Sequence, residues 1–85
     1  MKYRVDLSIQ TMGRLREMDQ HTAGIIMKWL RTYIEGCEDP RKHGGALLGD
    51  ADKWRYRVGS YKLLARIDDE SGKVLVVWIG TMEDT

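Results

Sequence analysis

Apolar and polar residues alternate along several stretches of the chain, which is typical of half-buried β-strands. Residues 3–7 show this alternation near the start, and residues 53–58 and 61–68 show it again in the second half. A shorter apolar run at residues 46–48 predicts a brief strand. Residues 73–79 are almost continuously apolar, which indicates a strand buried on both faces near the centre of a sheet.

Two stretches between these strands carry helical spacing instead. Ser8 is a suitable N-cap for a short helix, and Asp19 or Thr22 could cap a longer one that ends near Gly36. The expected apolar face of the first helix contains Ile9, Met12, Leu15 and Met18. The expected stripe of the second contains Ile25, Ile26, Trp29, Leu30, Tyr33 and Ile34. Because few residues separate the helices, we expect an antiparallel helical hairpin.

Turn-forming residues separate the strands. Residues 37–45 contain the only proline and a Gly-Gly pair, Gly59-Ser60 suits a two-residue type II′ turn, and residues 68–72 predict another turn. The resulting order, β-α-α-β-β-β-β, predicts an α+β fold. We expect an antiparallel-rich twisted sheet packed against an N-terminal helical hairpin, in a single domain spanning residues 1–85.

Several classes of protein are disfavoured. No apolar run approaches the roughly 20 residues of a membrane-spanning helix, and the first residues lack a signal-peptide core. Cys37 is the only cysteine, so an intramolecular disulfide is excluded and a reduced, cytoplasmic setting is expected. His21 and His43 lack metal-ligand spacing, and residues 68–70 suit a solvated acidic turn. We therefore expect no metal, no cofactor and no membrane partner.

The net charge of +1, from 14 basic and 13 acidic residues, argues at first against nucleic-acid binding. The charge is unevenly distributed, however. Residues 1–40 hold six basic and six acidic groups, and residues 68–85 hold one basic and five acidic groups. Residues 41–67 hold seven basic and two acidic groups, a net charge of +5. The candidate functional residues therefore lie in this middle segment.

The predicted Gly59-Ser60 turn would place five basic residues on one face of a hairpin: Lys53, Arg55, Arg57, Lys62 and Arg66. Arg57 would lie opposite Lys62, and Lys53 opposite Arg66. Like charges in these positions destabilise a sheet by about tenths of a kcal/mol per pair. No carboxylate is expected on the face. It is either a solvated outer face, where salt screens the repulsion, or a phosphate-binding surface.

This region resembles the RelE/ParE superfamily of bacterial toxin–antitoxin systems. Residues 54–62 read W-R-Y-R-V-G-S-Y-K, close to the family pattern W-R-x-R-x-G-x-Y-R. Residues 77–80 match the start of a third-strand signature that continues Ile-Gly-His-Arg. Further matches at Asp39-Pro40, Gly44 and residues 47–49, with the expected element order, extend the resemblance over nearly the whole chain.

The resemblance implies a RelE-like mRNA interferase. Such toxins cleave mRNA in the ribosomal A site through attack of a 2′-hydroxyl on the adjacent phosphate, without a metal. Arg55, Arg57 and Lys62 match basic catalytic positions, with Lys62 replacing the commoner arginine, and Lys53 and Arg66 would extend the RNA-binding surface. The implied partners are the ribosome, mRNA and a cognate antitoxin that supplies an acidic, partly disordered segment.

Two departures from the family pattern predict a weakened enzyme. Thr81-Met82 stands where the family has His-Arg, so Met82 occupies the position of a transition-state arginine. The family pattern also reaches a tyrosine about where this chain stops. Loss of a general acid or base commonly costs about 10²–10⁴-fold in rate. Two alternatives therefore stay open: a ParE-like DNA gyrase inhibitor, and a non-catalytic RNA- or partner-binding module on the same fold.

Overall fold

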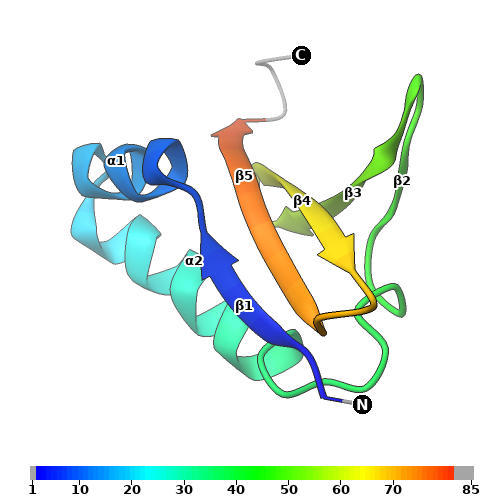
Figure 1. Ribbon diagram of the computed structural model, residues 1–85. Coiled ribbons are helices and arrows are strands. Elements are labelled where there is room, and N and C mark those ends of the chain that lie inside the picture. The colour runs from blue at the N-terminus through cyan, green and yellow to red at the C-terminus, as the bar shows by residue number, and fades with distance from the viewer. Residues whose placement is uncertain (1, 82–85) are drawn as a thin grey trace.

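The computed structural model describes residues 2–81, apart from the side chain of Ala51. One strand, two helices and four further strands follow one another in the predicted order (Figure 1). In chain order they are β1 (Arg4–Leu7), α1 (Ile9–Glu17), α2 (Gln20–Tyr33), β2 (Gly45–Leu47), β3 (Asp50–Val58), β4 (Tyr61–Asp68) and β5 (Lys73–Thr81). The predicted α+β fold is confirmed.

The strands form one sheet in the order β1-β5-β4-β3-β2. β5 pairs in parallel with β1 and antiparallel with β4, so the continuous apolar run forms an interior strand, although the central position predicted for it belongs to β4. Val74 and Val76 are fully buried and Ile79 nearly so. Figure 1 shows both helices gathered at the β1 side, while the β2–β3 hairpin projects from the opposite side. Neither described helix is long and apolar enough to cross a membrane.

The β3–β4 hairpin has the predicted turn and register. Gly59 has a φ of 61°, and no non-glycine residue among those described has a positive φ, as a type II′ turn with glycine first requires. Val58 pairs with Tyr61, and Arg57 with Lys62. The short strand differs by one residue from the prediction: β2 begins at Gly45 and ends before Leu48, which is 98% exposed in the turn.

Helix α2 covers the inner face of the sheet with a narrower stripe than its sequence predicts. Ile26, Leu30 and Ile34, spaced at four-residue intervals, are buried against that face. Each such side chain contributes roughly 1.5–3 kcal/mol of burial free energy. Ile25 and Tyr33 were expected in the stripe but are 50% and 46% exposed. Each precedes a buried residue by one position, which rotates it about 100° around the helix axis toward solvent.

Helix α1 has the predicted N-cap, but the side of the helix that faces the sheet differs from the predicted one. The Ser8 hydroxyl oxygen accepts from the Thr11 amide at 3.1 Å, and the Thr11 hydroxyl donates to the Val76 carbonyl at 2.9 Å. This tether turns Thr11, which is 1% exposed, toward β5. Ile9 and Met12 are consequently exposed by 82% and 38%, so their predicted place on the buried face is wrong. The predicted Leu15 and Met18 do pack, half-buried, against the core.

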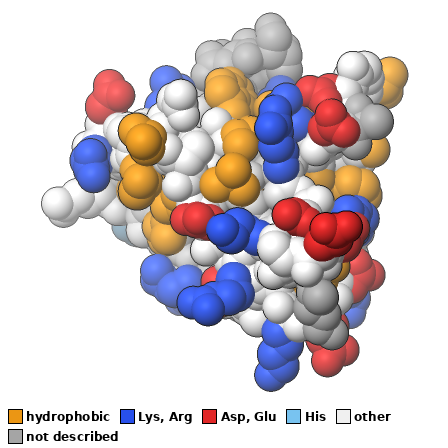
Figure 2. Space-filling view, in the orientation of Figure 1, with side chains coloured by type: hydrophobic (Ala, Val, Ile, Leu, Met, Phe, Trp, Pro, Cys, Tyr) orange, Lys and Arg blue, Asp and Glu red, His pale blue; other side chains and the backbone are white. Residues whose placement is uncertain are grey.

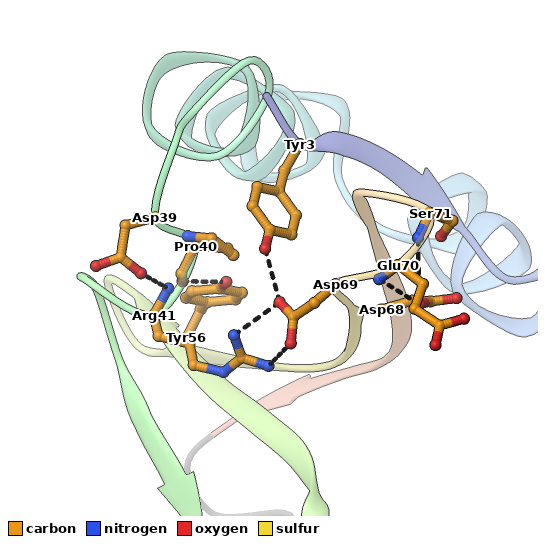
Figure 3. A network of polar contacts seen from close by, with 9 residues as sticks. All are labelled: Tyr3, Asp39, Pro40, Arg41, Tyr56, Asp68, Asp69, Glu70 and Ser71. Atoms are coloured by element: carbon orange, nitrogen blue, oxygen red, sulfur yellow. Dashed lines mark hydrogen bonds and ion pairs between the residues drawn. The ribbon is translucent and has the colours of Figure 1, made fainter. Parts of the chain in front are cut away.

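A polar network fastens the loop after α2 to the turn between β4 and β5 (Figure 3). The Tyr3 hydroxyl donates to Asp69 at 2.6 Å, and the Arg41 guanidinium binds both Asp69 oxygens at 3.0 and 3.2 Å. The hydrogen bonds from Arg41 and then Tyr3 hold the pKa of Asp69 below its ordinary value. Nearby, the buried Tyr56 hydroxyl donates to the Pro40 carbonyl at 2.6 Å. The acidic turn is therefore a structural anchor as well as a solvated segment.

Candidate functional site

Three adjacent strands present two rows of side chains on the sheet face turned away from the helices. Arg57 on β3 lies opposite Lys62 on β4, which in turn lies opposite Gly80 on β5. The next row contains Arg55, Leu64 and Trp78. Residues between them on β3 and β4, such as Tyr56 and Leu63, point into the core and are fully buried. The sequence prediction that Arg55, Arg57 and Lys62 share one face is borne out by this register.

Lys62 is unusually enclosed for a lysine on an open sheet face. The residue is only 6% exposed, and its Nζ lies 5.5 Å from the centroid of the Trp78 ring. No carboxylate within residues 2–81 lies within ion-pair distance of Lys62. A cation–π contact of this kind contributes about 0.5–2 kcal/mol, depending on desolvation. The indole ring therefore partly replaces the interaction with a carboxylate that usually stabilises a buried ammonium group.

Gly80 explains how the Trp78 ring reaches Lys62. A β-carbon added to Gly80 would collide with Cη2 and Cζ2 of the Trp78 ring and lie 2.9 Å from Cζ3. The indole thus extends along β5 from its own row and lies over the Gly80 backbone in the next row. A register irregularity between Leu64 and Ala65 accompanies this, since Leu64 pairs with Trp78 but Ala65 pairs with Val76. Val77 is the extra residue of the resulting bulge.

Lys53 differs from the other basic residues because a carboxylate neutralises it. Its Nζ lies 2.7 Å from an Asp50 oxygen. The hydrogen bond from Lys53 is the largest cause of the lowered pKa of Asp50, with a smaller contribution from the positive charge of Arg66. The expectation that no carboxylate shares this face is therefore wrong: Asp50, at the start of β3, reaches it.

Lys53 and Arg66 do not pair across the strands as predicted, because the paired residues of β3 and β4 end at Trp54 and Ala65. Lys53 and Arg66 nevertheless line the same open groove, of about 610 Å³. The groove combines cations with apolar side chains, and its lining consists of Gln10, Leu47, Lys53, Lys62, Leu64, Arg66, Val77 and Trp78. It can accept an anionic ligand that also carries flat apolar surface.

Arg55 and Arg57 stand exposed on β3 beside this groove. The Arg57 Nε donates to the Gly59 carbonyl at 3.4 Å, which leaves its terminal nitrogens free to bind a ligand. No carboxylate in the described part of the chain pairs with either arginine. Figure 2 shows acidic and basic side chains interspersed over one side of the molecule. On the β3–β4 hairpin, Arg55, Arg57 and Lys62 together form a group of cations without a carboxylate partner among residues 2–81.

His21 and His43 do not join this surface, and Met82 lies outside the described residues. His43 packs against Trp29 and Tyr33, with ring centroids 6.0 and 5.2 Å apart, and His21 is exposed at the start of α2. Within residues 2–81, no three His, Cys, Asp or Glu side chains are grouped so that they could hold a metal ion.

Sequence reasoning missed the contribution of Trp78 to the site. The tryptophan belongs to a continuous apolar run, and only the bulge at Val77 decides which face it takes. The adjacent signal was Gly80, because a glycine in a central strand marks a close approach by another group. Here that group is the indole itself.

No protein-family model matches the sequence, and no curated protein matches it. Several solved structures resemble it. The toxin–antitoxin complex RelBE2 from Mycobacterium tuberculosis matches with a TM-score of 0.81 and 22% identity, covering 95% of this chain and 99% of that one. A mutant of the Escherichia coli toxin RelE in the free state matches with a TM-score of 0.79 and 24% identity, covering 100% and 88%.

The archaeal RelE–RelB complex from Pyrococcus horikoshii matches over 100% of both chains, with a TM-score of 0.72 and 16% identity. The chain therefore has the fold of RelE toxins, and the resemblance seen in residues 54–62 and 77–80 is confirmed at the level of the fold.

Proposed function

We propose that this chain is a RelE-like toxin of a type II toxin–antitoxin system, acting in the cytoplasm as a single domain. Its activity would be ribosome-dependent cleavage of mRNA in the A site. The observation that carries the proposal is the group of Arg55, Arg57 and Lys62 on the open face of a RelE-type sheet, with no carboxylate of residues 2–81 in ion-pair distance. A fold shared with RelE toxins supports it.

The proposed reaction needs only the RNA and this chain's cations. The 2′-oxygen of one nucleotide attacks the adjacent phosphorus, the bond from phosphorus to the 5′-oxygen breaks, and the proton of the 2′-hydroxyl ends on that 5′-oxygen. The products are a 2′,3′-cyclic phosphate and a free 5′-hydroxyl. Negative charge builds up on the phosphoryl oxygens in between, and fixed cations lower the barrier by stabilising it.

The three cations suit different parts of this task. The exposed guanidinium groups of Arg55 and Arg57 offer planar forks that bind phosphate oxygens in pairs. Lys62, enclosed beneath Trp78, provides a single positive charge in a less hydrated setting, where its attraction for a phosphoryl oxygen is stronger. Met82, at the position of the family's arginine, supplies no charge. We therefore expect cleavage to be slower than in a toxin with the complete pattern.

The proposed partners are the ribosome, mRNA and a cognate antitoxin with an acidic, partly disordered segment. Among the similar structures, the RelBE complexes pair a RelE toxin with an antitoxin. An acidic segment that folds on binding would complement the basic hairpin and neutralise it.

A second function is favoured by Met82, because a binding function does not need the missing arginine. It is inhibition of DNA gyrase by a ParE-like protein, and a non-catalytic RNA- or partner-binding module is the remaining alternative. A supercoiling assay with purified gyrase distinguishes these: inhibition supports the ParE-like function, and its absence, together with absence of cleavage, leaves binding alone.

Primer extension on mRNA in translating ribosomes tests the main proposal. We expect new 5′ ends within the A-site codon when the chain is added. Arg57→Ala should greatly reduce them, whereas Arg16→Ala, which removes an exposed cation from α1, should leave them unchanged. Absence of A-site cleavage by the unaltered chain at any concentration would contradict the proposal.

A further inference from the structure

Trp78 is a large aromatic side chain on the open face of the sheet, in a groove to which α1 contributes only Gln10. Its neighbours in β5, Val76 and Ile79, point into the core and are buried, whereas Trp78 is half-buried beside the cations. The core therefore does not require a tryptophan at this position. A ring on an exposed sheet face between basic residues calls for an explanation in terms of what the face binds.

The ring is held in a defined position by the absence of a side chain at Gly80. It lies over the Gly80 backbone and beside Lys62, whose ammonium group is 5.5 Å from the ring centroid. A tryptophan placed this way keeps one side against the protein and leaves the groove side open, since Trp78 also lines the 610 Å³ groove. The arrangement presents a flat aromatic surface next to a positive charge.

Two kinds of ligand use a flat apolar surface beside cations: an unpaired nucleobase with its phosphate, and an acidic peptide with apolar side chains. Both ligands are anionic, and the spacing favours the first. Arg55 lies in the same cross-strand row as Trp78, and Arg57 in the neighbouring row. Strands two apart are separated by about 10 Å, a distance that one extended nucleotide and an arginine side chain can bridge. Every nucleobase has a face that can stack on an aromatic ring.

We propose that Trp78 is a base-stacking platform, on which one unpaired base of the RNA lies while Lys62 and the β3 arginines bind the adjoining phosphates. Gly80 permits this by leaving room for the indole. The inference deepens the proposed function, on which it rests, by assigning a substrate-binding residue outside the basic cluster. It also implies that the chain binds bases as well as phosphates.

Binding of two oligonucleotides tests the inference. One is a fluorescently labelled single-stranded RNA of five nucleotides, and the other is an abasic oligomer with the same number of phosphates. Trp78→Leu keeps apolar bulk but removes the aromatic face, and Trp78→Phe keeps a smaller one. Stacking of one base contributes about 1–3 kcal/mol, so Trp78→Leu should weaken RNA binding by about 5- to 150-fold.

The controls separate stacking from charge. Trp78→Leu should change affinity for the abasic oligomer by less than about twofold, and Trp78→Phe should recover most of the RNA affinity. Arg57→Ala should weaken binding of both oligomers. Equal RNA affinity of Trp78→Leu and the unaltered chain would overturn the inference. So would equal affinity of the unaltered chain for the RNA and the abasic oligomer.

A measurement on the unaltered protein keeps the test valid if Trp78→Leu folds poorly. In a nuclear magnetic resonance titration with the same RNA, the indole N–H signal of Trp78 should shift saturably. The Trp54 indole, whose N–H donates to the His43 carbonyl, should stay in place. A Trp78 signal that does not move at saturating RNA would overturn the inference.

The peptide alternative and the proposed function are tested separately. If Trp78→Leu loses affinity for an acidic leucine-rich peptide but not for RNA, the ring is a protein contact and the inference fails. If A-site cleavage and its sensitivity to Arg57→Ala are found while Trp78→Leu binds RNA normally, only the inference fails. If the unaltered chain cleaves no mRNA on the ribosome and binds neither oligomer, both fail.

Discussion

The two faces of the sheet are built from the same strands but obey different physical rules. On the inner face, Tyr56, Leu63 and Val76 are fully buried under α2, and their burial holds the molecule together. On the open face, Arg57 and Lys62 lie directly opposite each other, an arrangement that sheet stability disfavours. Alternation along a strand thus places residues that stabilise the fold next to charged residues that do not.

Replacing Met82 by the arginine of the family pattern should produce the largest effect of all the changes. It should alter only the function of the open face. Met82→Arg should raise A-site cleavage by about 10²-fold or more, because the restored arginine stabilises the negative charge of the transition state. Primer extension measures the rate. Met82→Gln, which adds a polar but neutral group, should give no such increase. An unchanged rate in Met82→Arg would show that the site is mapped wrongly.

Two neighbouring leucines measure the difference between the faces directly. Leu63→Ala should lower the free energy of unfolding by about 2–5 kcal/mol, because it leaves a cavity in a fully buried site. Leu64→Ala, on the open face and half-buried, should cost only about 1 kcal/mol. Urea denaturation of both variants provides the measurement. Equal losses of unfolding free energy in the two variants would contradict the distinction between the faces.

Acid should affect the fold through a carboxylate that lies away from the basic hairpin. The hydrogen bonds from Arg41 and Tyr3 lower the pKa of Asp69 in the folded state, so its contribution to stability is present above the unfolded value of about 3.9 and is lost as pH falls below it. Asp69→Asn should reduce stability at pH 7 and flatten its decline between about pH 5 and 3.

Denaturation midpoints across this pH range test the prediction, with RNA affinity at pH 7 as the control. That affinity should not change, since Asp69 lies at the β4–β5 turn and not on the hairpin face. A pH dependence identical to that of the unaltered chain would show that the Asp69 network is not needed for the fold.

The smallest expected effect is a gain in stability. Arg57→Gln removes one like-charge contact with Lys62 and should stabilise the fold by about 0.2–0.5 kcal/mol at low salt. The gain should disappear near 1 M salt, where the screening length is about 3 Å. The same change should lower the salt slope of RNA binding by about one, whereas Arg16→Gln on α1 should not. A loss of stability would mean that Arg57 is structural.

Local patterns were enough to predict the strands and the hairpin register. Alternation selects the buried face of β3 and β4, and the Gly59-Ser60 turn fixes which residues face each other, so Arg57 and Lys62 could be paired from the sequence. The interior position of β5, with a paired strand on each side, also followed from its apolar run. These features depend on residues close together in the chain, which is why one sequence sufficed.

Features set by distant contacts could not be predicted. The rotation of α1 depends on the Thr11 hydroxyl reaching the carbonyl of Val76, 65 residues away in the sequence. The ion pair of Lys53 with Asp50 depends on β3 beginning earlier than its alternation indicated. The position of Trp78 depends on the bulge at Val77, which only the pairing of β4 with β5 determines.

The parallel pairing of β1 with β5 has a consequence for the order in which the chain can fold. Val5 pairs with Val74, so β1 has no strand to pair with until β5 has been synthesised. Contacts of such long sequence separation form slowly. Lys62 and Trp78 likewise come together only after β5 has been synthesised and has paired with β4. The proposed RNA-binding surface is thus completed by the same late strand pairing that completes the sheet.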